Sequence, residues 1–437
     1  MPPAGLPFTK RTLANGLDVI VHEDHDLPIV AVNLWYHVGS KNERPGRTGF
    51  AHLFEHLMFE GSAHHNSGYF PPLQQAGAAV NGSTNTDRTN YWEVVPTSAV
   101  DLALWMESDR MGYLLPALTR ERFETQRDVV LNERRQNYEN RPYGFGLMAI
   151  MAALYPEDHP YHWVTIGAAE DIRAMQLEDV QAFFRTYYHP SNASLVLAGD
   201  IETARAFDLA EAYFGELPAG VVPEPVRASS SLAREVRLVL EDRVEMPRVY
   251  MAWQSPAMFT EGDAEMDLIG DLLGSGKTSR LYRTLVYEQR LALDVSAYQN
   301  SRELGSFFLL AATAAPGRSL TEIAALVDAE VQRLIDTGPS QDEMERAAAQ
   351  VEAAFLYRLQ TVGGFGGKSD QLNAYNVLRG DPGFFAADLA RYHNATQDSV
   401  RSAAERFLQF HTRVLLSIVP RGQQALALPG SEPVTIT

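Results

Sequence analysis

The alternation of hydrophobic and polar residues divides the first half of the chain into strands and helices in a definite order. Four apolar runs have the length and composition of strands, and they lie at 16–21, 29–38, 91–95 and 194–198. Four further segments carry apolar residues at helical spacing, and they lie at 48–59, 98–112, 119–140 and 176–187. A polar, proline-containing segment separates the first two strands, so we expect those two strands to form a hairpin.

A similar series of elements returns in the second half of the chain. Its strand-like and helical segments lie at 236–240, 249–253, 266–273, 341–359 and 414–416. Matching landmarks have nearly equal spacing, because His189 follows Pro28 by 189 − 28 = 161 residues and His411 follows Pro247 by 411 − 247 = 164. We therefore predict an internal duplication of one α+β unit, with a coincidental order of common elements as the alternative.

A stretch rich in proline, glycine and serine lies between the two halves and is typical of an exposed connector. It predicts an N-terminal domain at 1–216, a linker at 217–232 and a C-terminal domain at 233–437. The length of 437 residues suits two domains, taking about 150 residues per domain as a guide.

Composition narrows the chemistry that this chain can carry. Hydrophobic residues make up 45% and charged residues 21%, which is typical of a folded globular protein. The net charge of −18 disfavours nucleic acid as a partner and suits a basic peptide better, and the alternative is that the acidity only keeps the protein soluble. The absence of cysteine excludes disulfides, thiolate nucleophiles and cysteine-bound zinc, so a metal site must use histidine and carboxylate ligands. No run approaches the roughly 20 apolar residues of a membrane span.

The strongest chemical signal is a His-x-x-Glu-His string in the predicted helix 48–59. His52 and His56 are four residues apart, so both imidazoles project from one face of a helix and can bind one metal ion. Glu55 lies on the same face, three residues after the first histidine, where it can reach a water molecule beside the metal. A catalytic zinc site keeps one position open for water, so a third protein ligand is required.

Glu133 is the candidate for that third ligand. In the predicted helix 119–140, Gln126, Val130 and Glu133 fall on one stripe at i, i+4 and i+7. A carboxylate on a stripe that includes an apolar residue is costly to bury unless a cation meets it, and zinc would be that cation. The alternative is a purely structural, metal-free pair of helices.

The residues around this motif resemble the inverzincin peptidases, the family that includes pitrilysin, insulysin and the mitochondrial processing peptidases. In that family a glutamate ligand follows the second histidine by 76 residues, and here 133 − 56 − 1 gives 76. Flanking segments are also similar to the family's, at 38–40, 45–46, 48–49, 59–62 and 87–91. The resemblance covers nearly the whole chain, and the length favours the shorter, processing-peptidase-like bacterial branch.

The resemblance implies a fold and an assembly. The fold is two homologous α/β-sandwich domains, each a mostly antiparallel sheet covered by helices, and the chain forms half of a clam-shell dimer around a chamber. It also implies one zinc ion per chain, with His52, His56 and Glu133 as ligands and Glu55 as general base. Helix 266–273 of the second half contains no histidine, which agrees with a single site.

The resemblance assigns roles to further residues. Gln126 stands where relatives often carry a glutamate that contacts a ligand, and its amide can still form a hydrogen bond there. Phe59 is similar to a residue at the first specificity pocket, with an ordinary core aromatic as the alternative. Asn81, Gly82 and Ser83 resemble the edge strand that pairs with the substrate backbone.

Family members often place an Arg, and a Tyr seven residues later, in the second half to hold the substrate carbonyl. Here Tyr287 and Asp294 occupy those positions. We therefore expect a dimer, and specifically a heterodimer whose homologous subunit supplies the missing Arg and Tyr. Arg283 or Arg290 is the alternative source of the cation.

The expected function is that of a zinc metalloendopeptidase which hydrolyses peptides or unfolded polypeptide segments. The competing functions are a non-catalytic, core-type structural subunit and a peptide-binding chamber protein of the same fold. The segment 274–278 resembles a phosphate loop, but Asp271 replaces a required glycine, so we expect no nucleotide site. The compartment stays open, and the bacterial periplasm, reached with a leader that is then removed, is preferred to the cytoplasm.

Overall fold

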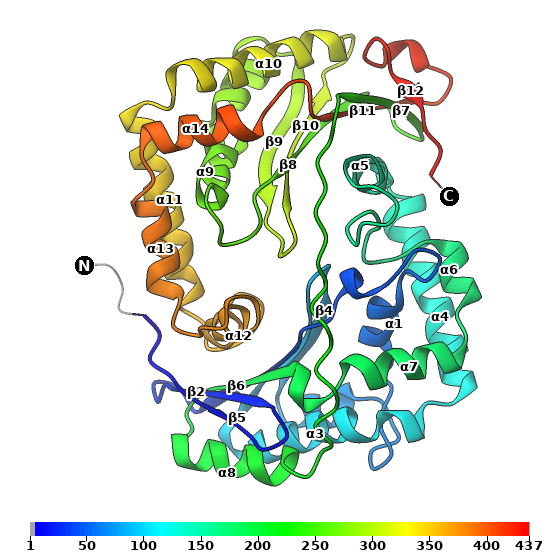
Figure 1. The fold of residues 1–437 in the computed structure, drawn as a ribbon, viewed down its shortest axis with the longest axis vertical. Coiled ribbons are helices and arrows are strands. Elements are labelled where there is room, and N and C mark those ends of the chain that lie inside the picture. The colour runs from blue at the N-terminus through cyan, green and yellow to red at the C-terminus, as the bar shows by residue number, and fades with distance from the viewer. Residues whose placement is uncertain (1–4, 437) are drawn as a thin grey trace. The chain divides into compact units, whose positions relative to one another are not determined.

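The computed structural model describes residues 5–436, which form two compact units (Figure 1). The first unit contains the chain up to Asn132, together with Thr165–Val226 and Ala353–Asp388. The second contains Glu133–Val164, Arg227–Glu352 and the chain from Leu389 onward. Each unit holds one six-stranded sheet.

The first sheet has the strand order β1-β2-β6-β3-β5-β4. Its strands are β1 (Thr9–Thr12), β2 (Asp18–Glu23), β3 (Ile29–Tyr36), β4 (Ala79–Thr84), β5 (Thr89–Pro96) and β6 (Ala193–Gly199). The predicted hairpin of the first two long strands is wrong, because β6 lies between β2 and β3, parallel to the former and antiparallel to the latter. All seven residues of β6 are buried, so this strand takes a central place with a neighbour on each side.

Helices cover both faces of the first sheet. The α-helices that lie in this unit wholly or in large part are α1 (Phe50–Leu57), α2 (Phe70–Gln75), α3 (Val100–Ala117), α4 (Arg120–Arg134), α6 (Ala169–Ala174), α7 (Leu177–Tyr187), α8 (Thr203–Phe214) and α12 (Lys368–Arg379). Helices α3 and α8 pack on one face and α12 packs against β6 and β3 on the other (Figure 1). Asn373 and Asn376 of α12 fix this packing, donating to the Asn33 carbonyl oxygen at 2.8 Å and the Ser194 hydroxyl at 2.9 Å.

The second sheet repeats the order of the first, as β12-β7-β11-β8-β10-β9. Its strands are β7 (Val236–Asp242), β8 (Arg248–Ser255), β9 (Ala292–Asn300), β10 (Ser306–Ala314), β11 (Val414–Pro420) and β12 (Glu432–Pro433). The buried strand β11 again lies between two earlier strands, parallel to β7 and antiparallel to β8. The shared order confirms the predicted fold class of two homologous, mostly antiparallel sheets covered by helices.

The remaining helices cover the second sheet or lie at its ends. They are α5 (Gly146–Leu154), α9 (Asp263–Gly274), α10 (Leu320–Thr337), α11 (Gln341–Arg358), α13 (Phe385–His393) and α14 (Gln397–Phe407). Helix α5 packs on β8 and β11, while α9, α10 and α14 pack on the opposite face (Figure 1). The core under α5 includes Ile150, Met151, Phe307 and Leu416, all fully buried.

Short helices occur at 40–42, 97–99, 190–192 and 424–426, and two π-helices complete the set, η3 (Arg135–Glu139) and η5 (Tyr282–Glu288). No helix within residues 5–436 is both long enough and apolar enough to cross a membrane.

Neither unit is contiguous in sequence, because each is built from three segments of the chain, and three of the boundaries between segments fall within α4, α11 and α13. Segment 133–164 belongs to the second unit and segment 353–388 to the first. The predicted connector carries no helix or strand from 218 to 233, and one unit boundary falls within it, between Val226 and Arg227. The linear division at 217–232 stays a prediction.

Candidate metal centre

Helix α1 has one buried face and one partly exposed face. Its buried residues are Phe50, Ala51, Leu53, Phe54 and Leu57. Phe54 anchors this face, since its ring centroid lies 5.7 Å from that of Phe183 and 5.1 Å from that of Tyr188. His52, Glu55 and His56 are each half-buried on the other face. The hydrophobic pattern of the helix therefore turns all three polar side chains in one direction.

The start of α1 is held by a buried carboxylate. Gly49 caps the helix in the left-handed region with φ of 92°, which favours glycine. The two carboxylate oxygens of Glu43 accept hydrogen bonds from the backbone N–H groups of Gly49 and Ala51, each at 2.9 Å. A negative charge at a helix N-terminus satisfies free N–H donors and complements the helix dipole. Thr48 adds a second anchor through its hydroxyl, which donates to Asp171 at 2.6 Å.

Helix α4 presents Glu133 near its C-terminal end. Val130 on the same stripe is fully buried and Glu133 is half-buried, as the predicted stripe requires. The helix then continues as the π-helix η3, a form that is rare and frequently found at functional sites. Within η3, the Asn137 side-chain amide donates to Glu133 Oε1 at 3.2 Å. Asn137 lies four residues after Glu133, on the same helical face, and the sequence interpretation overlooked it.

The structure brings together the three side chains predicted as ligands. One ligand atom from each of His52, His56 and Glu133 lies within 4.8 Å of the other two. The two imidazole rings are 4.9 Å apart between centroids and nearly perpendicular, at 84°. Ligand atoms about 2.0–2.2 Å from a tetrahedral ion lie roughly 3.3 Å apart, so small side-chain rotations would complete the coordination. The donor set of two imidazoles and one carboxylate fits zinc.

Among residues 5–436, these three side chains form the one group of at least three potential ligands that lie close enough to share a metal ion. The histidines at 22 and 25, 64 and 65, and 159 and 162 join no such group among these residues. His64 instead contacts Asp109, and His162 Nδ1 lies 2.8 Å from the carbonyl oxygen of Tyr155.

Arg88 is a second residue that the sequence interpretation passed over, although its segment was noted as family-like. Burial lowers the pKa of its guanidinium, while the negative charges of Asp370, Glu55 and Asp87 oppose that shift. Its Nη1 donates to the carbonyl oxygen of Ser83 at 2.8 Å and to the Ser83 hydroxyl at 2.6 Å. Arg88 therefore places a positive charge in the field of Glu55 and, through its hydrogen bonds to Ser83, fixes the end of strand β4.

Strand β4 lies at the edge of the first sheet, where among residues 5–436 it pairs with β5 alone. It carries Asn81, Gly82 and Ser83, which were predicted as substrate contacts. A methyl group at position 82 would meet the ring of Tyr91 at 2.9 Å and the ring of Phe59 at 3.0 Å. Only glycine fits against these rings without displacing them, so the predicted aromatic and the predicted edge strand are in direct contact.

Phe59 belongs to an aromatic cluster with a buried cation beneath it. Its ring stacks on Phe70 with centroids 4.6 Å apart. The guanidinium of Arg110 lies 3.9 Å from the ring centroid of Tyr69 and 4.1 Å from that of Tyr91. Burial, together with the charge of Glu107, raises the pKa of Glu93 beside this cation. Phe59 is thus a packed aromatic, and a role in substrate binding stays a prediction.

Gln126 donates its side-chain amide to Glu60 Oε1 at 2.6 Å. Glu60 follows helix α1 by three residues. The predicted contact between Gln126 and a metal ligand stays a prediction, since the hydrogen bond that the structure gives this amide is to Glu60.

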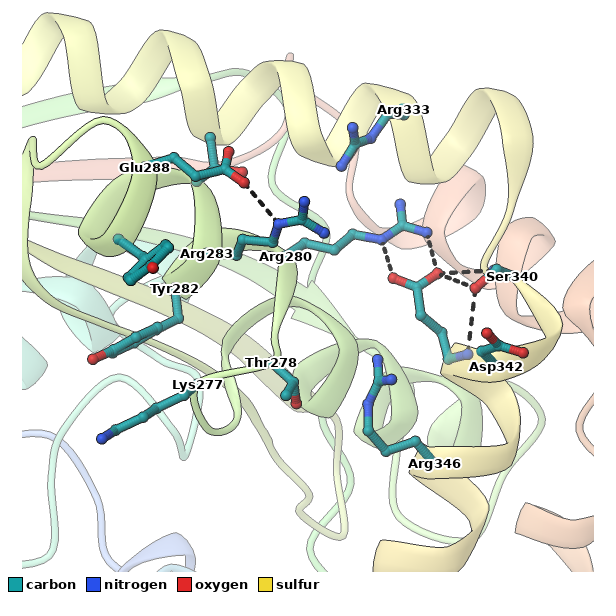
Figure 2. Close-up of a pocket in the computed structure, with 13 residues that line it drawn as sticks. Lys277, Thr278, Arg280, Tyr282, Arg283, Glu288, Arg333, Ser340, Asp342 and Arg346 are labelled. Atoms are coloured by element: carbon teal, nitrogen blue, oxygen red, sulfur yellow. Dashed lines mark hydrogen bonds and ion pairs between the residues drawn. The ribbon is translucent and has the colours of Figure 1, made fainter.

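A pocket of about 1020 Å³ in the second unit contains several of the residues that were weighed for that half (Figure 2). Lys277 and Thr278 follow the C-terminus of α9, so the segment 274–278 lacks the strand-to-helix setting of a phosphate loop. Arg283 Nε donates a hydrogen bond to Glu288 Oε1 at 2.7 Å, drawn as a dashed line in Figure 2. Tyr287 is 75% exposed at the rim.

Asp294 lies outside this pocket. It accepts a hydrogen bond from Thr313 at 3.0 Å and pairs with Arg248 at 3.7 Å.

Comparison with known proteins places these features in a family. Residues 18–160 match the family described as Insulinase (Peptidase family M16), and residues 174–351 match Peptidase M16 inactive domain. The zinc protease PqqE of Helicobacter pylori is 29% identical over 360 residues, which is 80% of each chain.

Solved structures give the same result for the fold. The crystal structure of a protease from Helicobacter pylori superposes with a TM-score of 0.88 at 26% identity, covering 95% of this chain and all of that one. The periplasmic protease PqqL of Escherichia coli has a TM-score of 0.79 at 18% identity, and the match covers 98% of this chain but 50% of PqqL. The two sheets with one shared strand order, the two family matches and the similar structures agree, and the chain belongs to the insulinase family of peptidases, family M16.

Proposed function

We propose that this protein is a zinc-dependent metalloendopeptidase that hydrolyses peptides or unfolded polypeptide segments. The observation that carries the proposal is the approach of His52, His56 and Glu133 to within 4.8 Å of one another, on a face that also presents Glu55. These four residues all lie within 18–160, the part that matches the insulinase family, and outside 174–351, which matches the inactive domain. The similar protein PqqE is named a zinc protease, which supports zinc as the metal.

The two histidines and Glu133 would hold the ion. Zinc bound there would polarise the scissile carbonyl as a Lewis acid and lower the pKa of a water molecule at its open position. Asn137 fixes the orientation of the Glu133 carboxylate through its hydrogen bond to Oε1.

Glu55 acts as the general base and then as the general acid. Its carboxylate takes a proton from the attacking water as the new carbon–oxygen bond forms at the scissile carbonyl. It then gives that proton to the amine nitrogen as the carbon–nitrogen bond breaks, so the carboxylate is regenerated. Arg88 places its positive charge in the field of this carboxylate.

The substrate backbone is held in an extended form along the free edge of β4. An edge strand offers unpaired backbone groups at which a peptide can add as a further strand. The glycine at position 82 leaves this edge close to the aromatic cluster around Phe59, which would take an apolar side chain of the substrate.

The functional assembly contains two homologous chains. PqqL is matched along 50% of its length by 98% of this chain, so that single protein has the length of two such chains. Tyr287 and Asp294 supply no cation to the substrate carbonyl, so a heterodimer with a subunit that carries Arg and Tyr at these positions is the expected active form. Native mass spectrometry of the protein purified from its source would reveal the second subunit, and full activity of this chain alone would refute the heterodimer. The periplasmic compartment stays a prediction, which cell fractionation tests.

The proposed activity is tested by metal content and peptide cleavage together. We expect about one zinc per chain by mass spectrometry of metals, and chelator-sensitive cleavage of an unstructured quenched fluorescent peptide. Glu55→Gln should keep the zinc and lose at least roughly 100-fold in kcat/KM, since general acid–base catalysis contributes about 10²–10⁴-fold.

Glu124→Gln is the matched control, because this exposed glutamate lies nine residues before Glu133 on α4 and so faces the opposite side of the helix. Zinc binding without any cleavage, in the presence of every candidate partner, would instead favour a peptide-binding chamber protein. Absence of zinc would favour a structural subunit.

A further inference from the structure

We propose that a pocket in the second unit, lined by tyrosines and arginines, is a subsite that binds a carboxylate group of the peptide. The proposal rests on the proposed peptidase function and names a chemical class of substrate for it. The pocket has a volume of about 690 Å³. Its walls come from the segment 137–147 and from strands β8, β9 and β10.

The charge of the lining selects an anion. Two guanidinium groups, those of Arg141 and Arg248, line the pocket, and none of the lining residues is acidic. Arg248 is partly neutralised by Asp294, which stands outside the lining at 3.7 Å. Arg141 is exposed and makes no ion pair with any of residues 5–436, so its charge is available to a ligand.

The uncharged groups of the lining are also mainly donors. Arg248 Nη1 donates to the hydroxyl oxygen of Tyr250 at 3.2 Å, which leaves the proton of that hydroxyl to point elsewhere. A tyrosine hydroxyl keeps its proton at neutral pH, and burial raises the pKa of Tyr298 further, so this hydroxyl is also a donor. Two phenol donors and two guanidinium groups facing one space match an anionic group that only accepts hydrogen bonds, and among peptide groups that is a carboxylate.

The pocket begins beside Glu133, the proposed metal ligand that belongs to the second unit. Asn137 lines the pocket and donates its side-chain amide to Glu133, both residues belonging to the second unit. A peptide with its scissile bond near Glu133 would therefore carry a neighbouring side chain, or its own C-terminus, into the pocket. An acidic side chain and a C-terminal carboxylate share this chemistry.

The pocket is built on a fixed turn. Tyr143 has φ of 61°, a left-handed backbone that a tyrosine seldom adopts. Its backbone N–H donates to Asp242 and its hydroxyl donates to the Met246 carbonyl oxygen, each at 2.8 Å, while the guanidinium of Arg248 lies 3.9 Å from its ring centroid. These contacts hold the strained residue in place, which is how strain is retained at binding sites.

The subsite is tested by peptide binding, which does not depend on turnover. The full-length chain with Glu55→Gln is titrated into N-terminally labelled, amidated neutral peptides in which a single Glu is moved along the sequence. Each has a Gln-containing counterpart, and one neutral peptide also has a free C-terminal acid. Fluorescence anisotropy should show about tenfold tighter binding for one Glu position or for the free acid, as expected for a charge-assisted hydrogen bond. The Glu series and the free acid distinguish the two sources of the carboxylate.

Arg141→Gln should reduce that preference to less than about twofold, and Tyr298→Phe should reduce it in part. Arg243→Gln removes an exposed arginine of the same unit outside the pocket and should leave the preference unchanged. Equal affinity for all peptides, no measurable binding of any, or a preference that survives Arg141→Gln would overturn the subsite. A carboxylate preference in a chain that never cleaves peptides would uphold the subsite and reject the peptidase, so the two failures are distinguishable.

Discussion

Replacing Glu43 by glutamine tests how the start of helix α1 positions the proposed metal ligands. The carboxylate of Glu43 is buried and accepts two backbone hydrogen bonds at the helix N-terminus, from Gly49 and Ala51. Glutamine has nearly the same volume but only one acceptor oxygen and no charge. Its NH₂ group would face a backbone N–H, so one donor would lose its partner.

The magnitude follows from these two bonds. A hydrogen bond to a charged group contributes about 1.5–3 kcal/mol, and loss of a helix N-terminal cap costs about 0.5–2 kcal/mol. With one bond retained in a neutral form, we expect Glu43→Gln to destabilise the first unit by about 2 kcal/mol. For a unit of this size that corresponds to a fall in Tm of roughly 4–8 °C. Because α1 supplies two of the three proposed ligands, zinc affinity should fall by roughly tenfold.

Thermal unfolding of the metal-free protein and zinc competition against a chromophoric chelator measure the two effects. Glu170→Gln is the control, since it removes an exposed carboxylate from the first turn of α6. Its stability should change by no more than about 0.5 kcal/mol. The reasoning is refuted if Glu43→Gln unfolds within about 1 °C of Glu170→Gln and binds zinc equally well.

Three further predictions concern both units. Burial and the charge of a neighbouring aspartate raise the pKa of Asp267 to about 7 from 3.8, so the folded state keeps a proton that the unfolded state releases. The contribution of Asp267 to stability is therefore full below pH 3.8 and is lost as pH rises through 7. Urea unfolding should show a free energy of unfolding that falls by up to about 4 kcal/mol over this range, and Asp267→Asn should flatten this pH dependence. Gly82→Ala should reduce kcat/KM for peptides by displacing two aromatic rings, whereas Gly68→Ala, whose methyl group would be in ordinary contact with Pro71 at 3.7 Å, should not; equal rates would contradict the role of this edge. Asn137→Ala should raise the zinc dissociation constant roughly tenfold, and an unchanged constant would exclude Asn137 as the orienting partner.

Periodicity in the sequence predicted the elements that bury apolar residues. The helical spacing at 48–59 and 119–140 corresponds to α1 and to α4 with η3, and the run 194–198 lies within the buried strand β6. The same periodicity placed both proposed histidine ligands on the partly exposed face of α1. These features depend on local patterns, which a single sequence contains.

Features that depend on contacts between distant residues were not predictable in this way. Strand β6 comes late in the sequence of the first unit yet lies between β2 and β3. The polar segment that joins β2 to β3 is compatible both with a hairpin and with this insertion, so the sequence pattern could not distinguish the two. Asn137 could have been found, since it lies four residues after Glu133 on one face. The left-handed backbone of Tyr143 could not, because its stabilising partners, Asp242 and Met246, lie about a hundred residues later in the chain.

The assignment of segment 353–388 to the first unit, and of 133–164 to the second, affects how the protein can be divided. A cut in the connector near residue 226 would give two fragments that each lack a covering helix, α12 in one case and α5 in the other. The bare sheet face would expose apolar residues such as Ile20 and Val196, which pack around Leu372 in the intact chain. Single fragments should therefore aggregate, and the two halves should become soluble only when they are made together.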